Sequence, residues 1–174
     1  MLDAKMPAGT AIHAALLDAA AEFQKDASVR LGRRAVLMLT DGSGLNHLVT
    51  EDQAVQALSK ANVVVNAIVV GKTRGARLLP GSNPDFSPSD VFSIAERTGG
   101  EAVRAERAGQ AFADKLGRLR SRYSLAFALP AEAKPGTFRR LRVELSAAAK
   151  QRYPKAQLRA RGGYEVGGVI ENSK

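Results

Sequence analysis

Hydrophobic residues follow two alternating patterns over the first two thirds of the chain. Amphipathic helical spacing alternates with short runs that are apolar at nearly every position. Such runs are typical of strands covered on both faces of a parallel sheet. The expected helices are 9–24, 50–61, 87–98 and 107–122, and the expected strands are 34–40, 62–71 and 101–105. This alternation predicts an α/β domain.

Local signals mark several boundaries of these elements. Thr50 precedes Gln53 by three residues, which is the spacing of a capping box at a helix start. Ser87 is expected to cap the next helix, with Pro88 in its first turn. The segment 72–88 is rich in Gly and Pro and has no period, so a long loop is expected there.

The pattern changes to period two after residue 122. The segments 123–129, 138–145 and 157–164 each alternate apolar with polar residues, as half-buried strands do. We therefore expect three antiparallel strands after the α/β domain in the sequence. The predicted organisation is an α/β domain over 1–121, a basic antiparallel β extension over 122–166 and a tail over 167–174.

Composition and charge add two constraints to this picture. The chain has 174 residues, 45% of them hydrophobic, which suffices for one buried core, and no cysteine for disulfides or thiolate metal sites. Residues 1–96 hold 9 Lys and Arg against 10 Asp and Glu, whereas residues 97–174 hold 17 against 7. The basic charge thus belongs to the second half. No apolar run reaches the roughly 20 residues of a membrane span, no signal-peptide pattern is present, and the sequence leaves localisation open.

Asp41 ends the apolar run in "RRAVLMLTDGSG", at the strand end where α/β folds bind ligands. The alternative is a purely local turn, because Asp-Gly is favoured in turns. The run follows "GTAIHAAL" and precedes "ANVVVNAIVVG" and "IAERTGGEA", and this order resembles the von Willebrand factor type A domain. The later "YSLAFALP", "GTFRRLRVELS" and "QLRARGGYEV" resemble a bacterial subgroup with a basic C-terminal extension.

This resemblance implies a three-layer, doubly wound, mostly parallel sheet with a metal-ion-dependent adhesion site. In that family three loops supply the oxygen ligands, and Thr10 and Asp41 match two of them, with Ser43 as a weaker candidate. Hard oxygen ligands suit Mg²⁺ or Mn²⁺. The resemblance further implies a protein-interaction module, not an enzyme, whose protein partner presents a carboxylate.

The family's first metal loop, Asp-x-Ser-x-Ser, does not occur in this sequence. We interpret the chain as an N-terminally incomplete domain whose remaining ligands hold a metal only weakly. The absent strand would lie beside residues 35–40, so this strand is expected to form an open edge. Because no charge or proline interrupts it, self-association through residues 35–40 is expected.

A rival function uses the basic extension. Its alternating arginines could contact nucleic-acid phosphates or another acidic surface: Arg140, Arg142, Arg159 and Arg161. No aromatic residues interleave with them to stack bases, so a solvated sheet face is the favoured interpretation. Elsewhere, no acid–base pair indicates catalysis, and His13 and His47 are expected to be exposed, close to the strand-end site.

Overall fold

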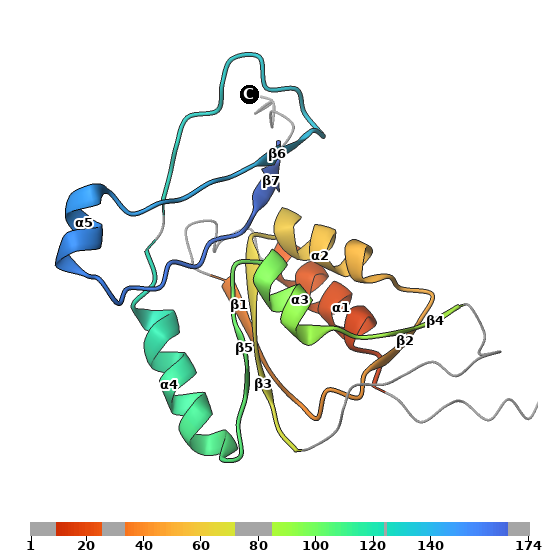
Figure 1. Cartoon of the computed structure of the whole chain (residues 1–174). Helices are drawn as coiled ribbons and strands as arrows, with labels where there is room; N and C mark the ends of the chain where they lie inside the picture. The colour runs from red at the N-terminus through yellow and green to blue at the C-terminus, as the bar shows by residue number, and fades with distance from the viewer. Residues whose placement is uncertain (1–9, 26–33, 72–84, 124, 167–174) are drawn as a thin grey trace, which may run out of the picture.

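A small parallel sheet forms the centre of the molecule (Figure 1). The computed structural model describes residues 10–25, 34–71, 85–123 and 125–166. The sheet has three strands in the order β1-β3-β5, with bounds Arg34–Thr40, Val63–Val69 and Ala102–Arg104. All pairs are parallel, and β1 aligns with β3 along its whole length, from Arg34 opposite Val63 to Thr40 opposite Val69. The expected mixed α/β architecture is confirmed.

Helices flank this sheet on both sides. Figure 1 shows α1, α2 and α3 together on one side and α4 on the other. Their bounds are Ile12–Lys25, Glu51–Lys60, Val91–Arg97 and Ala108–Arg120. Alternate residues of β3 meet the first group of helices, and they form one apolar core with Ile12, Leu16, Leu58 and Ile94. None of the helices in the described ranges is long and apolar enough to cross a membrane.

N-terminal caps were predicted for two helices, and only the first of these predictions is confirmed. The capping box is present before α2, where the Thr50 side chain accepts from the Gln53 amide and the Gln53 side chain accepts from the Thr50 amide. The cap expected at Ser87 is wrong. Asp90 caps α3, and its Oδ1 accepts from the amides of Phe92 and Ser93 at 3.0 and 3.1 Å.

Ser87 and Pro88 belong instead to a strand that sequence reasoning missed. The strand β4, Phe86–Pro88, pairs antiparallel with β2, Leu45–His47. Both strands are only three residues long and 38 or more residues separate them, so no local pattern indicates the pairing. The expected loop 72–88 therefore ends in a strand, and residues 72–84 lie outside the described ranges.

The C-terminal extension differs from the expected three strands. Two short strands, β6 (Phe138–Arg140) and β7 (Gly163–Glu165), pair antiparallel, and a helix that was not predicted, α5 (Ala147–Arg152), lies between them. Residues 125–130 and 141–146 form no paired strand. Leu125 is 70% exposed, whereas Phe127 makes an edge contact with the Tyr164 ring at a centroid distance of 5.2 Å, so the apolar face expected there is only partly covered. The tail 167–174 lies outside those residues.

Glu101, at the start of β5, ties the extension and α4 to the sheet. Its carboxylate contacts the Lys115 ammonium, and it accepts from Arg118 at 3.0 Å and pairs with Arg159 at 2.9 Å. Lys115 is the residue of α4 that is buried, whereas Phe112 is 46% exposed. An ion pair thus contributes to the contact of α4 with the sheet.

The charges around Glu101 set its titration. Partial burial alone would raise the pKa of the carboxyl, but the hydrogen bond from Lys115 and the charges of Lys115 and the two arginines hold this pKa below its ordinary value. The folded carboxylate therefore stabilises the protein above the pKa of an unfolded glutamate, about 4.3. This stabilisation is lost as the pH falls through the folded pKa.

We expect Glu101→Gln to lower the free energy of unfolding by about 3 kcal/mol at neutral pH, because it leaves the buried Lys115 charge without a counter-ion. The difference from the wild type should shrink in acid, where the wild-type carboxylate also becomes protonated. Urea unfolding at neutral and acidic pH measures both effects. Glu106→Gln changes an exposed carboxylate and is the matched control. Equal stability of both variants would contradict the role of Glu101.

Candidate functional site

Thr10 and Asp41 lie at the same end of the parallel sheet. Asp41 directly follows β1, and Thr10 forms a parallel bridge with Gly44, three residues further on. The Leu45 amide donates to the Thr10 carbonyl at 3.1 Å, which fixes the start of α1 beside the turn after β1. Both residues line one hollow of about 540 Å³ between α1 and β1. The structure thus brings together the two residues that the sequence selected.

The turn after β1 is held by its own side chains. Asp41 Oδ1 accepts from the Ser43 amide at 2.9 Å, and Thr40 Oγ1 accepts from the Gly42 amide at 3.1 Å. Gly42 has a φ of 80°, a conformation that favours glycine. Asp41 therefore has the local turn role, while its side chain stays exposed at the strand end. A local role and a ligand-binding role are compatible here.

Close packing at Gly44 explains how α1 reaches this turn. A Cβ atom at residue 44 would lie 2.5 Å from Ile12 Cδ1 and 2.6 Å from Ser89 Oγ. The Ser89 amide also donates to the Gly44 carbonyl at 3.0 Å. Glycine at this position thus lets Ile12 and Ser89 pack closely against the turn, and a larger residue would displace their side chains.

A buried polar network that the sequence did not reveal lies beneath the turn. Asn46 Oδ1 accepts from the His13 amide at 2.6 Å, and Asn46 Nδ2 donates to the Ser87 carbonyl and to Ser89 Oγ, at 3.1 and 2.6 Å. Asn46 is 1% exposed. One side chain therefore joins α1, β2 and β4 behind the candidate site.

His13 also belongs to this network, and the expectation that it is exposed was wrong. It is 1% exposed, and Nδ1 donates to the Val49 carbonyl at 2.9 Å, which leaves Nε2 as an acceptor without a partner among the described residues. His13 lies three residues before Leu16 and seven before Ala20 in the sequence, and this helical spacing puts it on the buried face of α1. His47 is exposed, as expected, with its ring centroid 4.6 Å from that of Phe86.

The oxygen atoms at the strand end are suitable in kind for a hard cation but few in number. Thr10 offers a hydroxyl, Asp41 a carboxylate and Ser43 a second hydroxyl, whereas Mg²⁺ takes about six oxygen ligands. Within the described ranges, no group of three or more His, Cys, Asp or Glu side chains could hold a metal ion. These residues alone do not form a tight metal site.

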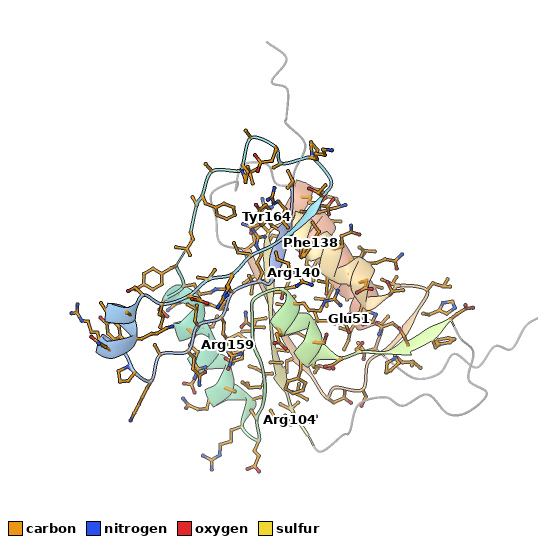
Figure 2. The ribbon with its side chains drawn as sticks, turned by 45° about the horizontal axis from the view of Figure 1, so that its top comes forward. Glu51, Arg104, Phe138, Arg140, Arg159 and Tyr164 are labelled. Carbon is orange, nitrogen blue, oxygen red and sulfur yellow. The ribbon has the colours of Figure 1, made fainter. Side chains whose placement is uncertain are left out.

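The four arginines of the extension do not form one continuous row. Arg159 pairs with Glu101, Arg142 pairs with Glu144, and Arg161 donates to Asn62 Oδ1 at 3.3 Å. Figure 2 shows Arg140 near Phe138 and Tyr164, and Arg159 apart from them, nearer the main sheet. Three of the four guanidinium groups therefore already contact oxygen atoms of this chain.

We expect Asn46→Ala to lower the free energy of unfolding by about 1–3 kcal/mol, because the buried His13 amide loses its acceptor and Ser89 Oγ loses a donor. The same change should loosen the turn, so the Leu45 and Ser89 amides, which donate to the Thr10 and Gly44 carbonyls, should exchange hydrogen faster. Thermal unfolding and hydrogen exchange measure the two effects. Gln110→Ala removes only an exposed contact with Asp114 and is the control. Normal exchange at Leu45 and Ser89 in Asn46→Ala would show that the network does not support the site.

No protein-family model and no curated protein sequence matches this chain. Its structure is similar over part of its length to the crystal structure of an uncharacterized membrane spanning protein from Vibrio fischeri. The match has a TM-score of 0.37 and 17% sequence identity, and it covers 54% of this chain and 48% of that chain. This chain thus spans about half the length of that protein, and the likeness is too weak to assign a family or a function.

Proposed function

We propose that this chain is a protein-interaction module, an N-terminally incomplete relative of the von Willebrand factor type A domain. The observation that carries the proposal is the contact between the start of α1 and the turn after β1, which places Thr10 and Asp41 on one hollow. Two segments 30 residues apart thus meet at the carboxyl end of a parallel strand, where α/β folds bind their ligands.

The finer architecture in this proposal is a three-layer, doubly wound sheet. The strand order β1-β3-β5 and the helices on both sides are compatible with it. In the proposed arrangement the strand of the absent Asp-x-Ser-x-Ser loop lies beside β1. The edge position of β1 in the described sheet agrees with this arrangement.

The proposed partner is a protein that presents a carboxylate to the strand end. Mg²⁺ or Mn²⁺ could bridge Asp41 and such a carboxylate, but one aspartate and two hydroxyls hold the ion weakly. The proposal assigns no catalytic residue, because the described residues at the strand end include no acid–base pair.

The rival function, binding of nucleic acid by the extension, has less support. Phosphate contacts need arginines whose charge is available, and two of the four candidates already pair with carboxylates, Arg159 with Glu101 and Arg142 with Glu144. Sequence-selective binding to a DNA or RNA oligomer that survives physiological salt would favour the rival.

We expect Mg²⁺ or Mn²⁺ to bind with a dissociation constant no tighter than about a millimolar, the weak end of the range for hard-cation sites. An NMR titration of the isotope-labelled chain with Mg²⁺, followed by a short aspartate-containing peptide, measures this. The shifts should centre on Thr10, Asp41 and Gly44, and Asp41→Ala should abolish them.

Asp18→Ala, which removes an exposed carboxylate from α1, is the matched control and should titrate like the wild type. Micromolar metal affinity lost in Asp41→Ala would show that further ligands complete the site. Peptide and metal shifts that are unchanged in Asp41→Ala would contradict the proposed site.

A further inference from the structure

The outer edge of β1 carries backbone groups that no described residue pairs. The Val70 amide donates to the Thr40 carbonyl at 2.9 Å, so Thr40 turns its backbone groups toward β3. Backbone groups alternate in direction along a strand, and Val36 and Met38 therefore face β3 as well. The amides and carbonyls of Ala35, Leu37 and Leu39 consequently face outward and form no hydrogen bond with other described residues.

A groove runs along this open edge. It is the hollow of about 540 Å³ between α1 and β1, with polar residues gathered at the end near Thr10 and Asp41. Along the rest of the groove the lining is apolar: Ile12, Ala15, Leu16 and Ala19 from α1, and Val36, Met38 and Leu39 from β1. Ala15 and Leu39 are exposed despite this apolar setting, and Leu39 is 60% exposed.

We propose that the groove between α1 and β1 receives an extended β-strand from another polypeptide, which pairs with β1 and inserts apolar side chains beneath α1. An extended backbone is the partner that matches outward donors and acceptors at every second residue. The proposal goes beyond the strand-end site, because its contacts are the β1 backbone and the alanines of α1.

The groove also defines the side chains of the incoming strand. Those that face α1 lie beside Val36 and Met38, where the lining offers no charge, so they are apolar. Ala15 and Ala19 are small and leave room for branched residues such as valine or isoleucine. The strand is about five to seven residues long, because β1 offers seven residues for pairing.

A second copy of this chain fits the groove less well than a free strand does. Its own β1 already packs Val36 and Met38 against its own core, and its own α1 lies on that side. Such a copy can pair with the backbone edge, but its Val36 and Met38 are not available to fill the groove. We therefore expect the self-association predicted from the sequence to be weaker than the binding of a free strand to the same edge.

The probe for this proposal is a synthetic peptide of about seven residues, alternating valine with threonine and ending in lysine at both ends for solubility. Fluorescence anisotropy of the labelled peptide measures binding to the full chain. Hydrogen exchange then compares the amides of Ala35, Leu37 and Leu39 with those of Val36 and Met38. We expect the outward amides to exchange fast in the monomeric chain, at concentrations below those of self-association, and to become protected when the peptide binds.

Ala15→Phe fills the groove and should weaken peptide binding at least tenfold. Ala21→Phe places the same side chain on an exposed position of α1 and is the matched control. Asp41→Ala should leave peptide binding unchanged, which separates this proposal from the strand-end site. If Ala15→Phe does not fold, the exchange of the outward amides in the wild type still decides the matter.

Sedimentation distinguishes the other occupants of the edge. We expect the chain alone to self-associate at tens of micromolar and the peptide to disperse it, because both use β1. A stable dimer that the peptide cannot disperse would make a second copy the occupant and overturn the proposal. Outward amides already protected in a monomer, or equal peptide binding by Ala15→Phe and Ala21→Phe, would overturn it as well.

Discussion

The structure depends on β3, a strand paired on both sides and buried along nearly its whole length. Such a strand needs a close neighbour at each edge, and residues 98–101 supply one. Gly100 makes the approach possible, since a Cβ atom there would lie 1.9 Å from the Val65 carbonyl oxygen. Thr98 Oγ1 accepts from the Val65 amide at 3.0 Å, and Asn66 Oδ1 accepts from the Glu101 amide at 3.2 Å. The glycine pair that ends α3 thus also positions the polar contacts of the buried strand.

The two sides of β3 are completed in different ways. On the β5 side, Glu101 connects the sheet to α4 and to the C-terminal extension through Lys115 and Arg159. On the other side, β1 covers β3, but the described residues leave the outer edge of β1 unpaired and Leu39 exposed. A sheet of this composition is normally buried on both faces. The unpaired backbone groups and the exposed apolar surface of the described sheet are therefore concentrated at β1, beside the strand-end site.

Local signals predicted the elements whose determinants lie close together in the sequence. The capping box of Thr50 and Gln53, the apolar strands and the strand-end position of Asp41 need only a few neighbouring residues. Ser87 was misplaced because an antiparallel partner, Asn46, competes with the local helix-start signal. Residues 125–129 of the alternating segment form no strand, because period two specifies a strand only where another layer covers one face. The sequence of the segment does not reveal whether such a layer is present.

The burial of polar residues was harder to predict from the sequence. Lys115 reads as a surface residue of a helix, and its burial depends on Glu101, fourteen residues away in another element. His13 lies on an apolar stripe, yet only the strands β2 and β4, which bring Asn46 and Ser89 together, explain how its backbone amide is satisfied. In both cases a long-range partner decides whether a polar group can be buried. The residue types alone, lysine and histidine, predict that these positions are exposed.

The two proposed sites are physically continuous, and this has a thermodynamic consequence. Thr10 and Asp41 stand at the polar end of the groove whose apolar part lies between α1 and β1. A strand in the groove would restrain α1, which starts beside Thr10, and β1, which ends before Asp41. The bridge between Thr10 and Gly44 already holds these two ends together, and a bound strand would restrain them further, so that less ordering entropy would oppose a ligand at the strand end. Coupling of this kind is reciprocal, so a ligand held between Thr10 and Asp41 would strengthen the binding of the strand by the same factor.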